Sequence, residues 1–501
     1  MTFVTARVHL RRGVRGGSVP MVTRGAFDRV VNGQYVAVGM SHSPPLNASP
    51  SRPARIFQSR VVEPLQAFMR TETSAGLVIL IGAALALLWA NSPWKESYTD
   101  LWGREVTIDF LGLHFQHHLA DFVNDVLMVP FFFMVGLEIK RELVHGQLAS
   151  PRRAALPIIA AAGGMAVPAI IYTLFNRGGE HMSGWGIPVA TDIAFSLGVL
   201  ALVGKRLPFS VKVFLLAIAV ADDLGGILVI ALFYSEGVQV VPLLVAAGLV
   251  GLILFANLVG VRSLVIYAGL GVALWAAFFE SGIHATLAGV VLALLTPAGP
   301  YYAREGFEAA LQPLVEAYRA ALARGDEEEV QGLLAEMERL ARETESPLDR
   351  LERQLAPWVS FVIVPIFAVA NAGVSITGSA VSAAVESPVA AGVALGLFLG
   401  KPIGILTATF LAVRLGIGAL PSGARWTQIA GVGLVAGIGF TVSLFITGLA
   451  FDPGLVQDEA KMGILAGSFL SGVVGYTYLR FVAARSDVPA PAPAPEGAPG
   501  R

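Results

Sequence analysis

The sequence contains no cysteine and few charged residues. None of its 501 residues is cysteine, and 14% are Asp, Glu, Lys or Arg. The absence of cysteine excludes disulfides, thiolate metal sites and cysteine nucleophiles. Because the net charge is −1, no excess of positive charge favours a nucleic acid partner. Such a small charged fraction is also too low for the surface of a soluble protein of this length.

Hydrophobic residues make up 55% of the chain, and its mean hydropathy is +0.67. A helix needs roughly 20 predominantly apolar residues to cross a bilayer. Twelve segments approach this pattern, at 73–92, 119–138, 154–175, 183–203, 209–234, 241–258, 262–279, 283–297, 355–375, 389–413, 427–449 and 458–482. The sequence therefore predicts an all-α polytopic membrane protein with about twelve transmembrane helices, and the lipid bilayer is its first partner.

Three segments depart from this pattern. Residues 1–62 are rich in Arg, Ser, Pro and Gly and lack the apolar run of a secretory signal, so we expect a disordered extension. Residues 483–501 form a Pro/Ala tail that cannot build a core. Between them lies the membrane domain, 63–482, with a cytoplasmic insert at about 303–350 whose charge spacing is that of a solvated helical hairpin.

The distribution of Lys and Arg predicts the orientation. One set of alternating loops carries ten of these residues: Lys140, Arg141, Arg152, Arg153, Lys205, Arg206, Lys212, Arg262, Arg414 and Arg425. The opposite set carries four: Lys95, Arg104, Arg177 and Lys461. Because cytoplasmic loops are enriched in Lys and Arg, the first set and both termini are expected in the cytoplasm.

One outer loop, REVTIDFLGLHFQHH, alternates apolar and polar residues around Leu111-Gly112. This alternation predicts a β-hairpin outside the membrane. The loop has no acidic or thiol partner at ligand spacing, so its histidines are interpreted as solvated hairpin residues rather than metal ligands. These histidines are His114, His117 and His118.

Four charged residues fall inside apolar spans, where an ionisable side chain is costly unless it is paired or faces water. They are Asp192, Asp222, Asp223 and Lys401. Three negative charges against one positive charge favour a site that binds protons or cations. Hard oxygen ligands from the carboxylates, Thr191 and unwound carbonyl groups suit sodium or lithium.

Asp222 and Asp223 are about 100° apart on a helix, so they cannot face one ligand equally. We expect one to bind the ion and the other to meet a partner. Lys401 is the only intramembrane cation that could pair with one of them. The alternative is that the aspartates only form a structural ion pair with Lys401.

Two spans contain helix breakers. Pro188 precedes Thr191 and Asp192, and Gly437 and Gly439 interrupt GLVAGIGFTVSLFI. Each break lies in the second helix of a group of three, 154–234 and 389–482, which indicates inverted repeats with a site at the midplane. The run GVGLVAGIG is no nucleotide loop, because it lacks a preceding strand and a Walker lysine.

Six stretches resemble the signature motifs of NhaA-type sodium/proton antiporters: FFFMVGLEIKREL, PVATDIAFSLGVLAL, ADDLGGI, SGIHATLAGV, GKPIGI and GIGFTVSLFI. The resemblance covers roughly 63–482. It implies twelve transmembrane helices with two crossed, partly unwound chains, a homodimer contact through the outer β-hairpin, and location in a bacterial cytoplasmic (inner) membrane.

By motif, the resemblance implies that Asp223 is the principal ion-binding residue and that Asp222 is the neighbour that pairs with Lys401. It places Thr191 and Asp192 at the chain crossing, where Asp192 and Lys401 have the signs to offset its positive and negative ends. The activity it implies is electrogenic: one sodium or lithium ion leaves for two protons that enter, without a cofactor. Either Asp222 or Lys401 could carry the second proton.

The resemblance also implies activation by alkaline pH through a cytoplasmic charge cluster matched by Glu138, Arg141, Glu142 and Glu352, and through His284. An isolated helix-end histidine is more often a structural hydrogen-bonding residue, although histidine titrates in a range that suits a sensor. Family members often carry Lys where this chain has Asp349, and the preceding insert is longer than usual. The pH profile is therefore expected to differ.

Three other functions fit parts of the pattern. The chief alternative is a sodium-coupled symporter of a small organic solute, which would need aromatic or arginine contacts near the aspartates. An intramembrane aspartyl protease would need two carboxylates that face each other across helices, as Asp192 and Asp223 could. A passive channel would not couple sodium to protons. The sequence favours a transporter rather than an enzyme.

Overall fold

The computed structural model describes residues 30–31, 34–35, 72–110, 113–204, 207–235, 237–261, 263–299 and 304–484. The chain divides into two units, Met1–Pro64 and Leu65–Arg501. In the first, strands β1 (Val30–Val31) and β2 (Gln34–Tyr35) pair antiparallel, and the rest of the predicted extension lies outside the described residues. So do the predicted tail beyond residue 484, Lys205, Arg206 and Arg262 of the orientation argument, and the hairpin turn Leu111-Gly112.

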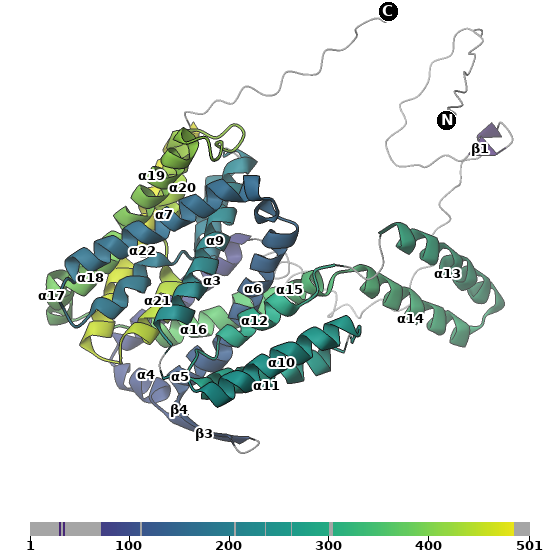
Figure 1. The fold of residues 1–501 in the computed structure, drawn as a ribbon, viewed down its shortest axis with the longest axis horizontal. Helices are drawn as coiled ribbons and strands as arrows, with labels where there is room; N and C mark the ends of the chain where they lie inside the picture. The colour runs from purple at the N-terminus through teal and green to yellow at the C-terminus, as the bar shows by residue number, and fades with distance from the viewer. Residues whose placement is uncertain are drawn as a thin grey trace, which may run out of the picture. The chain divides into compact units, whose positions relative to one another are not determined.

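The second unit is helical, and its core contains two groups of three membrane-crossing segments (Figure 1). The first group contains α7 (Pro151–Phe175), the 3-10 helix η4 (Met182–Val189) with α8 (Ile193–Val203), and α9 (Phe209–Phe233). The second contains α18 (Pro388–Leu395), the π-helix η7 (Gly396–Gly400), α19 (Lys401–Arg414), α20 (Trp426–Ala436), α21 (Phe440–Ala450) and α22 (Leu455–Ala484). The second segment of each group is the one that is broken.

Helices α7 and α19 cross at contact distance, because glycines face each other there. A Cβ atom on Gly404 would overlap the backbone carbonyl of Gly163, and one on Gly163 would overlap Ala408. Small residues of this kind let helix backbones approach closely in a membrane, where lipid already solvates the apolar side chains. The crossing fixes the position of Lys401, the first residue of α19.

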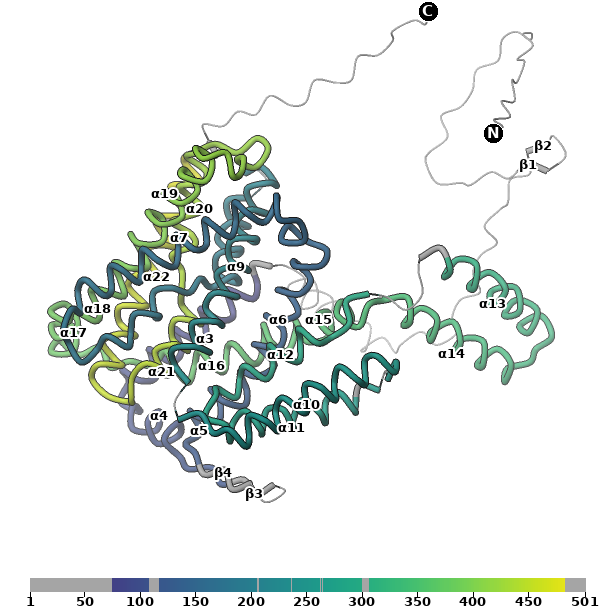
Figure 2. Tube along the Cα trace, viewed as in Figure 1, coloured from purple at the N-terminus to yellow at the C-terminus, as the bar shows by residue number. Residues whose placement is uncertain are grey.

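The remaining helices surround this core. Helix α3 (Glu72–Ala90) packs on α8 and on α16 (Val364–Asn371), and α6 (Met128–Val144) packs on α12 (Leu287–Leu295) and α9. The pair α10 (Val240–Leu258) and α11 (Leu264–Ser281) lies beside α12, as Figure 2 shows. The shorter peripheral elements are α4 (Lys95–Trp102), α5 (Leu119–Phe122), η2 (Val123–Leu127), η3 (Gln147–Ala149), η6 (Val359–Ile363) and α17 (Gly378–Glu386).

The predicted insert forms two helices, α13 (Arg304–Arg324) and α14 (Glu327–Thr344), which pack on each other before α15 (Pro347–Trp358). Strands β3 (Glu105–Phe110) and β4 (Leu113–His118) pair antiparallel in the predicted hairpin segment, with Glu105 opposite His118. Its position outside the membrane stays a prediction.

Eight helices in the described ranges are long and apolar enough to cross a membrane, and ten are if two bent pairs are included. The other two predicted spans differ. In 262–279 the apolar helix runs from Val265 to Ser281, and in 283–297 the helix α12 has only 9 residues. The structure therefore shows a multi-span helical membrane protein, and the number twelve stays a prediction.

Candidate functional site

The two broken helices meet at their breaks. The backbone is extended between η4 and α8, at Ala190 to Asp192, and three residues separate the end of α20 from the start of α21. The Asp192 amide donates to the Ile438 carbonyl over 2.6 Å, so the two unwound segments contact each other directly. Pro188 itself lies inside η4, and the break follows it by two residues.

Glycine is required in the second break because the chains approach closely. A Cβ atom on Gly437 would overlap the Leu397 carbonyl oxygen, and one on Gly439 would overlap the Ser443 hydroxyl. Neither glycine has a positive φ. Their role is to leave room for nearby atoms of the same protein rather than to adopt a left-handed conformation.

The Asp192 carboxylate caps two helices. Its Oδ1 accepts from the Phe195 amide over 3.1 Å, at the N-terminus of α8. Its Oδ2 accepts from the Thr441 amide over 3.1 Å and from the Thr441 hydroxyl over 2.5 Å, at the N-terminus of α21. Asp192 is buried, and its carboxylate lies at the positive ends of both helix dipoles.

Hydroxyl groups bind the opposite, carbonyl end of α20. The Thr191 Oγ1 lies 2.9 Å from the Ala436 carbonyl, and the Ser196 hydroxyl donates to the Val435 carbonyl over 3.1 Å. These contacts satisfy carbonyl groups that have no partner within the helix. The hydrogen bond of Lys401 goes to Asp222, and whether its charge offsets this negative end stays a prediction.

Lys401 and Asp222 form an ion pair with 2.5 Å between Nζ and Oδ2, and both side chains are fully buried. The Thr191 hydroxyl lies 2.8 Å from the same oxygen. The other carboxylate oxygen, Oδ1, has no hydrogen-bond partner in the described part of the chain. A buried oxygen left in this state is costly, so it is a natural position for a bound cation or a proton.

Asp223 differs from its neighbour. It is partly exposed, and neither a hydrogen bond nor an ion pair joins its side chain to any described residue. The charges of Glu138, Asp222, Asp192 and Lys401 all act on it. Because these groups carry more negative than positive charge when ionised, the site around Asp223 attracts cations.

The predicted pH-sensing residues divide into two places. Arg141 of α6 and Glu352 of α15 form an ion pair, and Glu142 accepts from the Gln147 amide over 2.8 Å. Glu138 interacts electrostatically with Arg141, Glu142 and Glu352. Since Glu138 also acts on Asp223, it links this cluster to the ion site.

His284 lies apart from that cluster. Its Nε2 is 2.7 Å from the Tyr234 carbonyl, at the C-terminal end of α9. Asp349 occupies the position where family members often carry Lys. It accepts a hydrogen bond from the Ser346 hydroxyl over 2.7 Å at the start of α15. Both contacts are of the kind that structural residues make.

The hairpin histidines form no metal site within the described residues, where no group of three His, Cys, Asp or Glu could hold an ion. The His118 Nδ1 lies 2.9 Å from the Gly103 carbonyl, and the His117 ring contacts Phe279 edge-on with 5.6 Å between centroids. The side chain of His114 lies outside the described part.

Sequence reasoning missed Thr441 and Ser196 as site residues. Thr441 stands two residues after Gly439, inside a motif that the sequence already singles out. A hydroxyl residue in the first turn after a helix break could have been predicted to meet a carboxylate from the other break. No comparable signal identified Ser196, since a serine within a helix usually bonds to its own backbone.

The chain is similar in sequence to known sodium/proton antiporters. The sequence profile of the family described as Na+/H+ antiporter 1 matches residues 66–479. The chain is 44% identical to Na(+)/H(+) antiporter NhaA 2 of Sorangium cellulosum, over 87% of this chain and 94% of the relative. It is also 44% identical to Na(+)/H(+) antiporter NhaA 1 of Myxococcus xanthus, over 89% of this chain and 99% of the relative. Among solved structures, it is similar to the sodium proton antiporter MjNhaP1 of Methanocaldococcus jannaschii, with a TM-score of 0.43 and 14% identity over 86% of this chain and 96% of that chain.

Proposed function

This chain belongs to the NhaA family of Na+/H+ antiporters, and on that premise we propose that it expels sodium or lithium through the carboxylates of Asp223 and Asp222. Membership supports antiport over the symporter, protease and channel alternatives. The assignment of Asp223 and Asp222 rests on the contrast between these two adjacent aspartates. Asp222 is fully buried and paired with Lys401, whereas Asp223 is partly exposed and has no such partner.

In this proposal Asp223 receives either a proton or the metal ion. A carboxylate with no fixed partner can exchange the two, because no ion pair has to be broken first. The unpartnered Oδ1 of Asp222 supplies a second hard oxygen ligand on the neighbouring residue. Competition between proton and cation for the same oxygens couples the two fluxes without a cofactor.

The helix crossing supplies the movable element. Few regular backbone hydrogen bonds hold the chain between Val189 and Ile193 or between Ala436 and Phe440, and Asp192, Thr191 and Thr441 bind across the two breaks. Unwound chain of this kind lines the binding cavities of carriers with inverted repeats. We assign the reorientation of the site to a shift of these two segments.

Exchange of one sodium ion for two protons would move one net positive charge inward per cycle. A membrane potential that is negative inside then drives the cycle with about 2.3 kcal/mol per charge per 100 mV. The second proton has two candidate carriers, Asp222 and Lys401, which titrate as a pair because they share a hydrogen bond. The distribution of Lys and Arg supports a cytoplasmic position for both termini in a bacterial inner membrane.

Regulation by pH is assigned to the contact between α6 and α15. Glu138, Arg141 and Glu142 lie on α6, and Glu352 on α15 pairs with Arg141. A carboxylate pair with arginine forms only when the carboxyl group is ionised, so acidification weakens the contact. His284 is a weaker candidate because its ring already contacts the Tyr234 carbonyl.

We further propose that the chain forms a homodimer through the β3–β4 hairpin. A two-stranded ribbon has two unpaired edges, and the same edge from a second copy can extend the sheet. Crosslinking between engineered cysteines on β3 tests this contact without background, since the natural sequence has no cysteine.

The decisive experiment measures the sodium-induced collapse of a respiration-generated proton gradient in everted vesicles that lack other antiporters. Wild type should collapse the gradient at neutral to mildly alkaline pH, and Asp223→Asn should not. Asp452→Asn, at an exposed aspartate after α21, is the matched control and should retain wild-type exchange. Full exchange by Asp223→Asn would remove this residue from the mechanism, and an absence of any sodium response in wild type would refute antiport.

A further inference from the structure

Helix α22 packs against the second helix break. It contacts α18, α20, α21 and η7, and it is continuous over 30 residues. The Gly439 amide at the start of α21 donates to the Ser468 hydroxyl over 3.3 Å. A Cβ atom on Gly475 would overlap the side chain of Val435, near the end of α20. Helix α22 therefore contacts the chain on both sides of the break.

A second serine of α22, Ser471, lies between these two contacts in the sequence and is fully buried. Its hydroxyl has no hydrogen-bond partner in the described part of the chain. A hydroxyl group inside a helix commonly donates to the carbonyl four residues earlier, as Thr477 of the same helix does to Val473 over 2.7 Å. The Ser471 oxygen makes no such bond and lies against Gly437 of the break instead.

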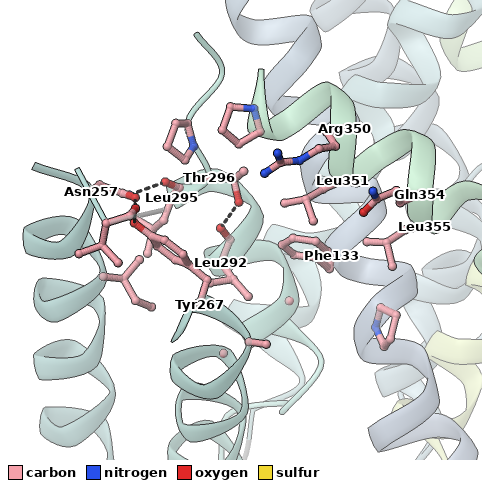
Figure 3. Close-up of a pocket in the computed structure, with 18 of the residues that line it drawn as sticks. Phe133, Asn257, Tyr267, Leu292, Leu295, Thr296, Arg350, Leu351, Gln354 and Leu355 are labelled. Atoms are coloured by element: carbon pink, nitrogen blue, oxygen red, sulfur yellow. Dashed lines mark hydrogen bonds between the residues drawn. The ribbon is translucent and has the colours of Figure 1, made fainter. Parts of the chain in front are cut away.

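Polar side chains at another place between helices satisfy one another. In the cavity between α10–α12 and the helices α6 and α15, the Tyr267 hydroxyl donates to Asn257 over 2.5 Å, and the Thr296 hydroxyl donates to the Leu292 carbonyl over 3.0 Å (Figure 3). A buried hydroxyl without a partner costs free energy in the state where it occurs. A second arrangement of the chain in which Ser471 gains a partner would offset that cost.

The carbonyl group of Leu397 is an acceptor close to this hydroxyl. A Cβ atom on Gly437 would overlap both the Ser471 hydroxyl oxygen and the Leu397 carbonyl oxygen, so the two oxygens lie close together on one side of Gly437. In a π-helix such as η7, a carbonyl accepts from the amide five residues later. For Leu397 that residue is Pro402, which has no amide hydrogen. The Leu397 carbonyl is therefore a suitable acceptor for a side-chain donor.

We propose that Ser471 is a positioning residue for ion exchange, and that its hydroxyl donates to the Leu397 carbonyl once the second break has shifted. This inference rests on the proposed function, in which the two breaks move to reorient the site. Movement of Gly437 away from the two oxygens would let them approach each other. Leu397 lies about one helical turn before Lys401, so the new bond would hold the turn that leads into Lys401.

The two serines of α22 then favour different states of the carrier. Ser468 bonds to the break in this structure, whereas Ser471 gains its bond only after the shift. A carrier works fastest when its two states are close in free energy, because a strong preference for one state leaves the other rarely populated. Two hydroxyl groups three residues apart lie on one face of a helix, and together they provide such a balance.

Two measurements on the full-length protein test this role: the melting temperature in detergent and sodium-dependent exchange in everted vesicles. Ser471→Ala removes a hydroxyl that has no partner in this structure, so it should melt above wild type. Its maximal exchange rate should fall about fivefold, which corresponds to one neutral hydrogen bond lost from the shifted state. The sodium concentration at half-maximal rate should stay within about twofold of wild type, because the carboxylates that bind the ion are untouched.

Two further variants of α22 serve as controls. Ser468→Ala removes the acceptor of the Gly439 amide and should melt below wild type. Thr477→Val removes an exposed hydroxyl that bonds to its own helix and should match wild type in both measurements.

A merely structural role for Ser471 predicts a different result. Ser471→Ala would then melt below wild type and lose exchange only in proportion to the loss of folded protein, and this outcome would overturn the proposal. An unchanged maximal rate in Ser471→Ala would overturn it as well. Either failure with active wild-type vesicles concerns Ser471 alone, whereas no sodium response in wild type would refute antiport itself and this proposal with it.

Discussion

The Nζ of Lys401 lies 2.5 Å from Oδ2 of Asp222, and neither side chain has any exposed surface. Two charges in such a place cost several kcal/mol each to desolvate, and the pair itself recovers much of that cost. Thr191 is the one other described residue that bonds to this carboxylate. The stability of the pair and its use in transport are therefore separable, and substitutions can distinguish them.

Removing Lys401 should destabilise the fold more than removing both charges. In Lys401→Met, Asp222 is left as an unpaired buried carboxylate, with an expected loss of about 3–5 kcal/mol at neutral pH. Adding Asp222→Asn removes that charge and should restore most of the loss, although exchange should stay absent. The measurement is the temperature at which the detergent-purified protein loses its monodisperse size-exclusion peak.

The pH dependence of this effect follows from its cause. Below the pH at which the lone Asp222 takes up a proton, Lys401→Met should approach the stability of the double variant. If the single and double variants melt at the same temperature at neutral pH, the buried pair is not the source of the loss.

Asp192 should matter through its charge and through its caps. Asp192→Ala loses the caps of α8 and α21 together, each worth about 0.5–2 kcal/mol, whereas Asp192→Asn keeps an acceptor oxygen. We expect the asparagine variant to melt between wild type and the alanine variant. Thr441→Val removes one donor to Asp192 and should cost less than Asp192→Ala. Equal melting of the asparagine and alanine variants would show that the charge, not the hydrogen bonds, is what counts.

The glycine contact between α7 and α19 should tolerate no side chain. In Gly404→Ala, the new methyl group would overlap the Gly163 carbonyl, so the helices must separate and Lys401 must move away from Asp222. We expect loss of folded protein or of exchange. Gly248→Ala, on α10 where nothing lies within 4 Å of the added atom, should be neutral or slightly stabilising because alanine favours helix. Membrane yield and vesicle exchange of the two variants check this.

The charged site residues and the helix-breaking residues could be predicted from the sequence, because each is unusual in a membrane-spanning segment. An aspartate in an apolar span needs a reason, and the nearby Pro188, Gly437 and Gly439 made breaks in these two spans plausible. The pairing of Lys401 with one aspartate followed from the same reasoning. Helix spacing alone did not show which aspartate it is, because that depends on the rotation of α9; only the family resemblance indicated Asp222.

The remaining features depend on tertiary contacts. Glycine is common in membrane helices, so the sequence did not distinguish Gly404, which contacts α7, from Gly248, where an added Cβ atom would have nothing within 4 Å. The π-helix η7 directly precedes Lys401 and changes the rotation of α19 relative to α18. Hydropathy also overestimated the helix in 283–297, because residues 283–286 were counted in the span although α12 begins only at Leu287.

Glu352 offers the clearest test of the pH-sensing proposal, because its pair with Arg141 bridges α6 and α15. Glu352→Gln keeps the shape of the side chain and fixes it in the neutral state that acidification produces. If the ionised pair favours the active state, this variant should need a higher pH for half-maximal exchange, while its maximal rate stays near that of wild type.

The matched control is Glu338→Gln, which removes a similar glutamate–arginine pair on the surface of α14. Exposed pairs of that kind contribute about 0–1 kcal/mol and should not affect the profile. The measurement is sodium-dependent collapse of the proton gradient at a series of pH values. A profile of Glu352→Gln that coincides with wild type would assign pH sensing elsewhere on α6, and Glu138 would be next to test, because it acts on both Glu352 and Asp223.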